Sequence, residues 1–202
     1  MSATPRNVVF ASALLLALWL TRDWMQAHMA RHMLLQMPLL AWSGWLLHAS
    51  TGKRVQGWLE PWNYYGLSGF LFIQCVAAFW MVPRALDLAL VSSIMAGAKV
   101  ASWILGGFLL RQSAQQSNII VELFMLGNFA MMTAAVSDIY ERAPIRLCNA
   151  YVQGDQVATA RGLLWLLLAI FVVWGLRAWR MHAFAEDGPL KLFMITTSDR
   201  AT

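Results

Sequence analysis

The stretch ARGLLWLLLAIFVVWGLRAW, residues 160–179, decides the fold class of this 202-residue chain. It has the length of about 20 apolar residues that an α-helix needs to cross a bilayer core of about 30 Å. The whole chain agrees with this stretch, since 59% of its residues are hydrophobic and only 12% are charged. A soluble domain normally carries about a quarter charged residues. We therefore expect an integral membrane protein.

Five more apolar segments of similar length precede this stretch. They cover residues 8–25, 29–49, 62–82, 85–110 and 119–140. Together with 160–179 they predict an all-α polytopic bundle of about six transmembrane helices within residues 1–181, followed by a C-terminal tail at 182–202. The first segment is similar to a signal peptide, but no small-x-small cleavage site follows it. We therefore interpret it as an uncleaved span.

The basic residues give the expected orientation. Eight Lys and Arg residues fall on the N-terminal side of such a bundle and six on the other side, which favours a cytoplasmic N-terminus. With six crossings, the first, third and fifth connections open on the same, outer side. These connections carry the polar residues His28, His32, Asp87, Cys148 and Asp155. The groups able to coordinate a ligand are thus expected to face one compartment.

The segment AHMARHMLLQM, residues 27–37, is the strongest chemical signal. On a helix, His28 and His32 lie one turn apart, and Met29 and Met33 occupy the adjoining strip. Imidazole and thioether ligands together favour Cu(I). The residues alone leave a second interpretation open, because methionine also packs helices and interfacial histidines hydrogen-bond to carbonyls or water. The two cysteines, Cys75 and Cys148, form no CxxC motif.

Ionisable residues inside the apolar segments give a second signal. Lys99 lies in the middle of the fourth expected span, and Glu122 lies near the start of the fifth. A charge at this depth costs on the order of 3 kcal/mol on insertion scales and usually finds a partner. Glu122 is a candidate partner for Lys99, although helix rise makes a direct pair strained. A proton or ion path is an alternative, and we favour a structural role in which Lys99 is neutral or bonds to carbonyl groups.

Three segments in order resemble the CtaG-type assembly proteins of cytochrome c oxidase. They are AHMARHMLLQMPLL at 27–40, WMVPRALDLAL at 80–90 and GDQVATARGLLW at 154–165. The resemblance implies a polytopic protein of the bacterial inner membrane that helps to deliver copper to haem-copper oxidases. It carries His28, His32 and Asp155 over as the first metal ligands, and then Asp87 and Gln156. In the third segment, two extra residues separate Asp155-Gln156 from the following Gly-Leu pair.

The sequence therefore leads to one main functional expectation and two alternatives. The main one is a non-enzymatic assembly factor that binds Cu(I) transiently near the outer membrane face and passes it to an oxidase subunit. The first alternative is an accessory, structural subunit of a respiratory membrane complex without bound metal. The second, a haem-binding subunit, is disfavoured because His28 and His32 share one helix and His48 lies at its far end.

Overall fold

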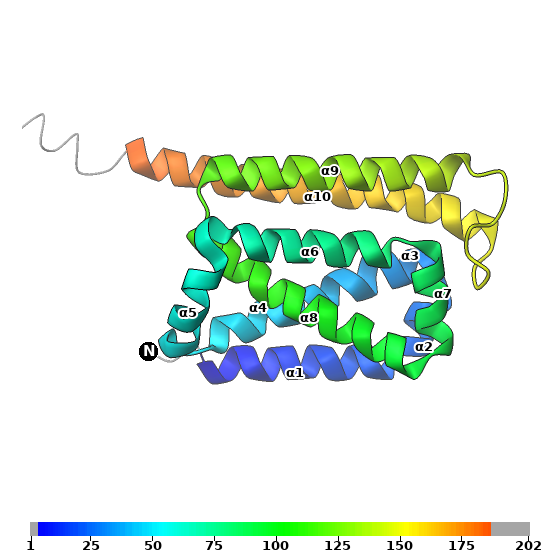
Figure 1. The fold of residues 1–202 in the computed structure, drawn as a ribbon, viewed down its shortest axis with the longest axis horizontal. Helices are drawn as coiled ribbons and strands as arrows, with labels where there is room; N and C mark the ends of the chain where they lie inside the picture. The colour runs from blue at the N-terminus through cyan, green and yellow to red at the C-terminus, as the bar shows by residue number, and fades with distance from the viewer. Residues whose placement is uncertain (1–3, 187–202) are drawn as a thin grey trace, which may run out of the picture. The chain divides into compact units, whose positions relative to one another are not determined.

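The computed structural model describes residues 4–186, which form helices joined by short turns and one longer loop and include no strand (Figure 1). The all-α prediction is thereby confirmed. The elements in chain order are α1 (Thr4–Leu20), α2 (Arg22–Gln26), α3 (Met29–Arg31), a π-helical turn (His32–Gln36), α4 (Met37–Ser50), α5 (Lys53–Leu59), a 3-10 segment (Glu60–Gly66), α6 (Leu67–Trp80), α7 (Pro83–Val91), α8 (Ser93–Gln116), α9 (Ile119–Arg142) and α10 (Gln153–Glu186).

Three of these helices are long and apolar enough to cross a membrane. Helices of this length and composition are those of a membrane protein. They are α8, α9 and the part of α10 up to Arg180. A fourth crossing is provided if the segment Arg54–Trp80 and α7, which are bent by 78° relative to each other, count as one broken span. The apolar part of α1 is shorter. The expected number of six spans is therefore not confirmed by length and composition.

The helix breaks differ from the expected segment ends. The segment expected at 85–110 is divided at Ser92, whose extended backbone (φ −115°, ψ 121°) begins α8 and whose Oγ accepts a hydrogen bond from the N–H of Met95 at 3.4 Å. Such a serine cap ends one helix and starts the next. The segment expected at 29–49 contains the π-helical turn before α4. The tail expected at 182–202 lies, from residue 187 onward, outside the described residues.

The centre of the bundle is the contact between α4 and α8. α1 packs on the other side of α4, and α6 packs against α8 (Figure 1). A Cβ added at Gly44 would lie 1.9 Å from the backbone oxygen of Ile104, and one at Gly107 would lie 1.8 Å from that of Ala41. Only glycine allows the two backbones to approach so closely, as small residues do in membrane bundles.

The chain divides into two compact units within α10, after Leu166. The first unit includes α9, which is tied to α6 by polar contacts. Gln74 Nε2 donates to the backbone oxygen of Met125 at 2.8 Å, and Asn128 Nδ2 donates to Gln74 Oε1 at 2.5 Å. All contacts discussed below lie inside this first unit.

Candidate functional site

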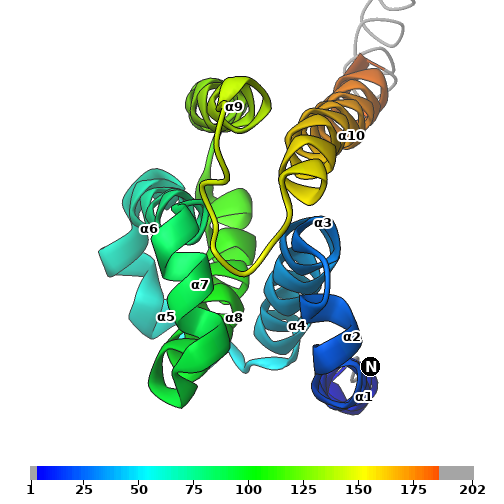
Figure 2. The same ribbon diagram turned by 90° about the vertical axis from the view of Figure 1, so that its right-hand side faces the viewer.

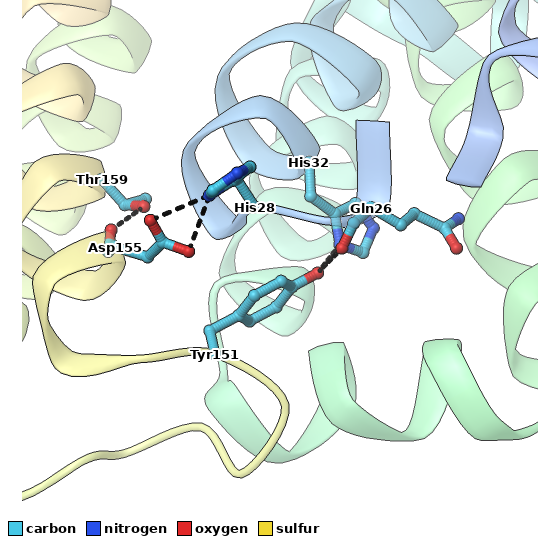
Figure 3. A network of polar contacts seen from close by, with 6 residues as sticks. All are labelled: Gln26, His28, His32, Tyr151, Asp155 and Thr159. Carbon is cyan, nitrogen blue, oxygen red and sulfur yellow. Dashed lines mark hydrogen bonds and ion pairs between the residues drawn. The ribbon is translucent and has the colours of Figure 1, made fainter. Parts of the chain in front are cut away.

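His28 and Asp155, which are 127 residues apart in sequence, meet at one end of the first unit (Figure 3). His28 has an extended backbone (φ −131°, ψ 137°) directly before α3. Asp155 lies in the first turn of α10. Nδ1 of His28 is 3.1 Å from both carboxylate oxygens of Asp155. The His28 side chain is 53% exposed and that of Asp155 is 21% exposed.

This contact fixes the hydrogen positions on the His28 ring. A carboxylate only accepts, so Nδ1 carries the hydrogen and donates it to Asp155. In the neutral ring, Nε2 then keeps the lone pair that binds a metal ion. Metal-binding histidines commonly donate their other ring nitrogen to a carboxylate in this way, which orients the ring. Asp155 is thus placed to orient His28, and its expected role as a direct metal ligand stays a prediction.

His32 lies in the π-helical turn and is fully buried, with both ring nitrogens hydrogen-bonded. Nε2 is 2.6 Å from Nζ of Lys99, and Nδ1 is 2.8 Å from the hydroxyl of Tyr151. The Tyr151 hydroxyl donates to the backbone oxygen of Gln26 at 3.1 Å. Because an ammonium group only donates, Nε2 of His32 accepts and Nδ1–H donates to Tyr151. In Figure 3 the rings of His28 and His32 point toward different partners.

Lys99 has partners other than the one considered from the sequence. It is 1% exposed in the apolar helix α8, and its Nζ donates to Gln36 Oε1 at 3.3 Å in addition to His32. Glu122, in contrast, accepts a hydrogen bond from the Ser117 hydroxyl at 3.1 Å. The structure therefore gives Lys99 two polar side-chain partners on the π-helical turn, the ring of His32 and the amide oxygen of Gln36.

The loop at 143–152, between α9 and α10, is held by the remaining candidate residues. The carboxylate of Asp87 on α7 accepts from the N–H groups of Asn149 at 2.8 Å and Ala150 at 3.2 Å. Gln156 accepts from the N–H of Leu147 at 2.9 Å and donates to the oxygen of Tyr140 at 3.0 Å. Viewed from this end, the loop passes between α7 and α3 (Figure 2).

These loop contacts give Asp87, Gln156 and Cys148 a positioning role. Cys148 is buried, and its thiol donates to the oxygen of Pro83 at 3.9 Å. Burial, and secondarily the charge of Asp87, raises the pKa of the Cys148 thiol to about 12. The thiolate that a metal or an electrophile requires is therefore rare at neutral pH. Burial also raises the pKa of Tyr151, so its hydroxyl keeps its hydrogen.

The methionines of the segment 27–37 lie in a sulfur-rich core directly inside this end. Met29 is fully buried and Met33 is 4% exposed. Six of the twelve methionines line or contact this core: Met29, Met33, Met37, Met81, Met95 and Met132. Among residues 4–186, no three His, Cys, Asp or Glu side chains lie close enough to hold a metal ion together. Any soft metal at this end would thus need thioether ligands as well.

The first, third and fifth connections, which the six-span pattern places on one side of the membrane, are in contact in the structure. The contacts His28–Asp155, His32–Tyr151 and Asp87–Asn149 join the first, third and fifth connections. Sequence reasoning missed Tyr151 and the contact that Gln36 makes with Lys99. Gln36 stands four residues after His32, and that helical spacing was an available signal, whereas Tyr151 lies in the loop before α10, where no local spacing reports its contact. Compared with models of known families, with curated proteins and with solved structures, the chain has no match.

Proposed function

We propose that this chain is a membrane-embedded assembly factor for a haem-copper cytochrome c oxidase. It binds Cu(I) transiently near the outer membrane face and helps to deliver the ion, without catalysing a reaction. The observation that carries the proposal is the His28–Asp155 contact. It combines an oriented imidazole, an exposed edge and a carboxylate partner, which is the arrangement that supports a metal-binding histidine.

The chemistry of the neighbouring side chains fits copper better than other ions. Imidazole nitrogen binds both copper and zinc, but thioether sulfur is a ligand that Cu(I) accepts, whereas zinc is bound by thiolate, imidazole and carboxylate, and calcium prefers oxygen. The His28 side chain is about half exposed, and the Asp155 contact uses Nδ1 and not Nε2. Met29 and Met33 belong to the sulfur-rich core. Copper is the cargo in this proposal. His28 receives it, and His32 with a methionine completes the ligand set.

The proposal includes six membrane crossings with a cytoplasmic N-terminus in a bacterial inner membrane. α3, the π-helical turn and α4 follow one another over residues 29–50, which is about 30 Å by helix rise and long enough to cross. With α1 as the first crossing and the segment from α6 to α7 as the third, the ends that carry His28, Asp87 and Asp155 share the outer side.

Oxidase maturation in cells tests this proposal. A strain that lacks the protein is complemented with the wild type, with His28→Ala/His32→Ala, or with His48→Ala. His48 is a control because it is a buried histidine near the C-terminal end of α4, whereas His28 and His32 precede α4. We expect the double variant to insert into the membrane and yet to yield oxidase with little copper, while His48→Ala supports normal copper content. Normal oxidase copper content with the double variant would overturn the proposal.

One observation favours a second candidate, the accessory subunit of a respiratory complex without metal. Both ring nitrogens of His32 are already bonded within the protein, as expected for a histidine that stabilises a buried polar network. This candidate predicts co-purification with a large membrane complex at fixed stoichiometry and without copper. The assembly factor instead predicts substoichiometric association and copper bound to the isolated chain.

A further inference from the structure

Lys99 holds the ring nitrogen of His32 that a metal ion would need. Its Nζ is 2.6 Å from Nε2, and both side chains are almost completely buried. The ammonium group can only donate, so the lone pair of Nε2 accepts this hydrogen bond. A metal–nitrogen bond uses the same lone pair. The Lys99 hydrogen bond and copper ligation by Nε2 therefore exclude each other.

The rest of the network prepares His32 as a ligand in every other respect. Nδ1–H donates to Tyr151 at 2.8 Å, and Tyr151 donates onward to the Gln26 oxygen. These bonds fix the tautomer in which Nε2 has the lone pair, as the hydrogen-bond partners of metal-binding histidines do. The loop that presents Tyr151 is itself fixed by Asp87. The position next to Nε2 is thus built for a cation, and Lys99 fills it.

Lys99 also has a second acceptor to which its charge can remain bonded. Gln36 Oε1 accepts from the same Nζ at 3.3 Å and is itself buried. A buried ammonium group without an acceptor is strongly unfavourable. Because Gln36 lies in the same π-helical turn as His32, the ammonium can keep an acceptor in this turn when it releases Nε2. Single π-helical turns inside α-helices are frequent at functional sites.

We propose that Lys99 is an internal cation that competes with copper for Nε2 of His32 and so regulates loading of the site; this inference rests on the function proposed above. In the metal-free protein the ammonium group bonds to His32. On loading, that N–H···N hydrogen bond breaks, the ammonium keeps its three hydrogens and its bond to Gln36, and the lone pair of Nε2 passes to Cu(I). On delivery the lysine returns, which keeps copper binding reversible.

Copper affinity of the purified full chain in detergent tests this competition, measured by Cu(I) exchange with a chromophoric chelator. Lys99→Leu removes the competitor without adding a thioether and is expected to raise the affinity about tenfold or more. Gln36→Leu leaves the ammonium with His32 alone and is expected to lower the affinity severalfold. Arg31→Leu is the matched control, since it removes the positive charge that precedes His32 in the sequence, from a partly exposed side chain that stacks on Trp24. It is expected to change the affinity by less than about twofold, because a partly exposed charge is screened by solvent.

The outcomes separate this inference from the proposed function. If the wild type binds copper, His28→Ala/His32→Ala does not, and Lys99→Leu binds no more tightly, the competition is overturned while the proposed function stands. If the wild type and the double histidine variant bind copper equally, the proposed function itself fails. The gain in Lys99→Leu must vanish when His32→Ala is added. The opposite effects of Lys99→Leu and Gln36→Leu guard against misfolding, since loss of structure lowers the affinity in both. An unchanged affinity in Gln36→Leu also overturns the competition.

Discussion

At the scale of single residues, the two histidines of the segment 27–37 have different environments and therefore different tasks. His28 is half exposed and oriented by a carboxylate, whereas His32 is fully buried between Lys99 and Tyr151. An exposed imidazole can meet an incoming ion without rearrangement. A buried one needs its internal partner to move first. Under the proposed function, these environments favour entry of copper at His28 and its retention at His32.

The role of Asp155 leads to the first prediction. Asp155→Ala removes the acceptor that orients His28 and is expected to lower Cu(I) affinity by about 10- to 100-fold, the usual cost of losing such a partner. Asp155→Asn keeps an oxygen that accepts from Nδ1–H, so its loss should be smaller. Chelator competition measures both. Asp138→Ala, which removes an exposed carboxylate paired with Arg142 at 2.7 Å, is the control. Equal affinities for Asp155→Ala and the wild type would contradict the role given to Asp155.

The buried thiol of Cys148 leads to the second prediction. With a pKa of about 12, roughly one thiol in ten thousand is ionised at pH 8, and only the thiolate is alkylated. In a Cys75→Ser background we expect iodoacetamide to modify folded protein far more slowly than unfolded protein, with the rate still rising above pH 10. Mass spectrometry of timed samples follows the reaction. Alkylation at the rate of a free thiol in the folded protein at pH 8 would show that the thiol is not buried.

Sequence reasoning found some of these residues and missed others for a physical reason. His28 and Asp155 belong to recognisable segments, and the structure brings their side chains together. For Lys99, the sequence indicated a partner on the neighbouring span, Glu122. Its partners His32 and Gln36 come instead from a helix that is more than sixty residues away in sequence. Packing of α4 against α8 creates that contact, and no local pattern reports it.

At the scale of elements, the sequence predicted helices well and their interruptions poorly. The apolar stretch 119–140 lies within α9, and 160–179 lies within α10. The break at Ser92 and the π-helical turn interrupt stretches that are apolar throughout, so hydropathy does not reveal them. The serine cap was readable in principle from the Ser92-Ser93 pair. The π-helical turn was not, because it depends on the tertiary contacts of His32 and Gln36.

The parallel contact of α4 and α8 leads to the third prediction. Gly107→Ala places a methyl group against the backbone of Ala41, and Gly44→Ala places one against the backbone of Ile104. Backbone cannot move aside as a side chain does, so we expect each variant to lose about 1–3 kcal/mol of stability. Gly97→Ala on the same α8 is the control, because its Cβ would meet nothing within 4 Å, and helix propensity favours alanine. Thermal unfolding in detergent compares the three. An unaffected Gly107→Ala would argue against the close α4–α8 contact.

At the scale of the whole molecule, the number of helices that can cross the bilayer decides the topology. By length and composition, three helices are long and apolar enough to cross, or four if the bent pair counts as one span. The two extra crossings of the six-span arrangement are α1 and the stretch from α3 through α4. Two residues at the ends of these helices distinguish six crossings from fewer. They are Asp23, which precedes α3, and Gly52, which follows α4.

The fourth prediction concerns which single cysteines an impermeant reagent labels in intact cells. In a background without Cys75 and Cys148, six crossings place Asp23→Cys and Asn149→Cys on the outer side and Gly52→Cys and Gln115→Cys on the inner side. An impermeant maleimide should therefore label only the first pair, and all four should react after the membrane is permeabilised. Labelling of Gly52→Cys in intact cells together with Asp23→Cys would mean that the segment between them does not cross.

Copper binding by the isolated chain tests the central claim most directly. The measurement is a titration of purified wild type and His28→Ala with Cu(I) in the presence of a competing chelator, which gives stoichiometry and affinity together. We predict one Cu(I) per wild-type chain and a clear loss of affinity in His28→Ala, with both proteins eluting as folded species. No bound copper in the wild type, or the same affinity in His28→Ala, would contradict the account.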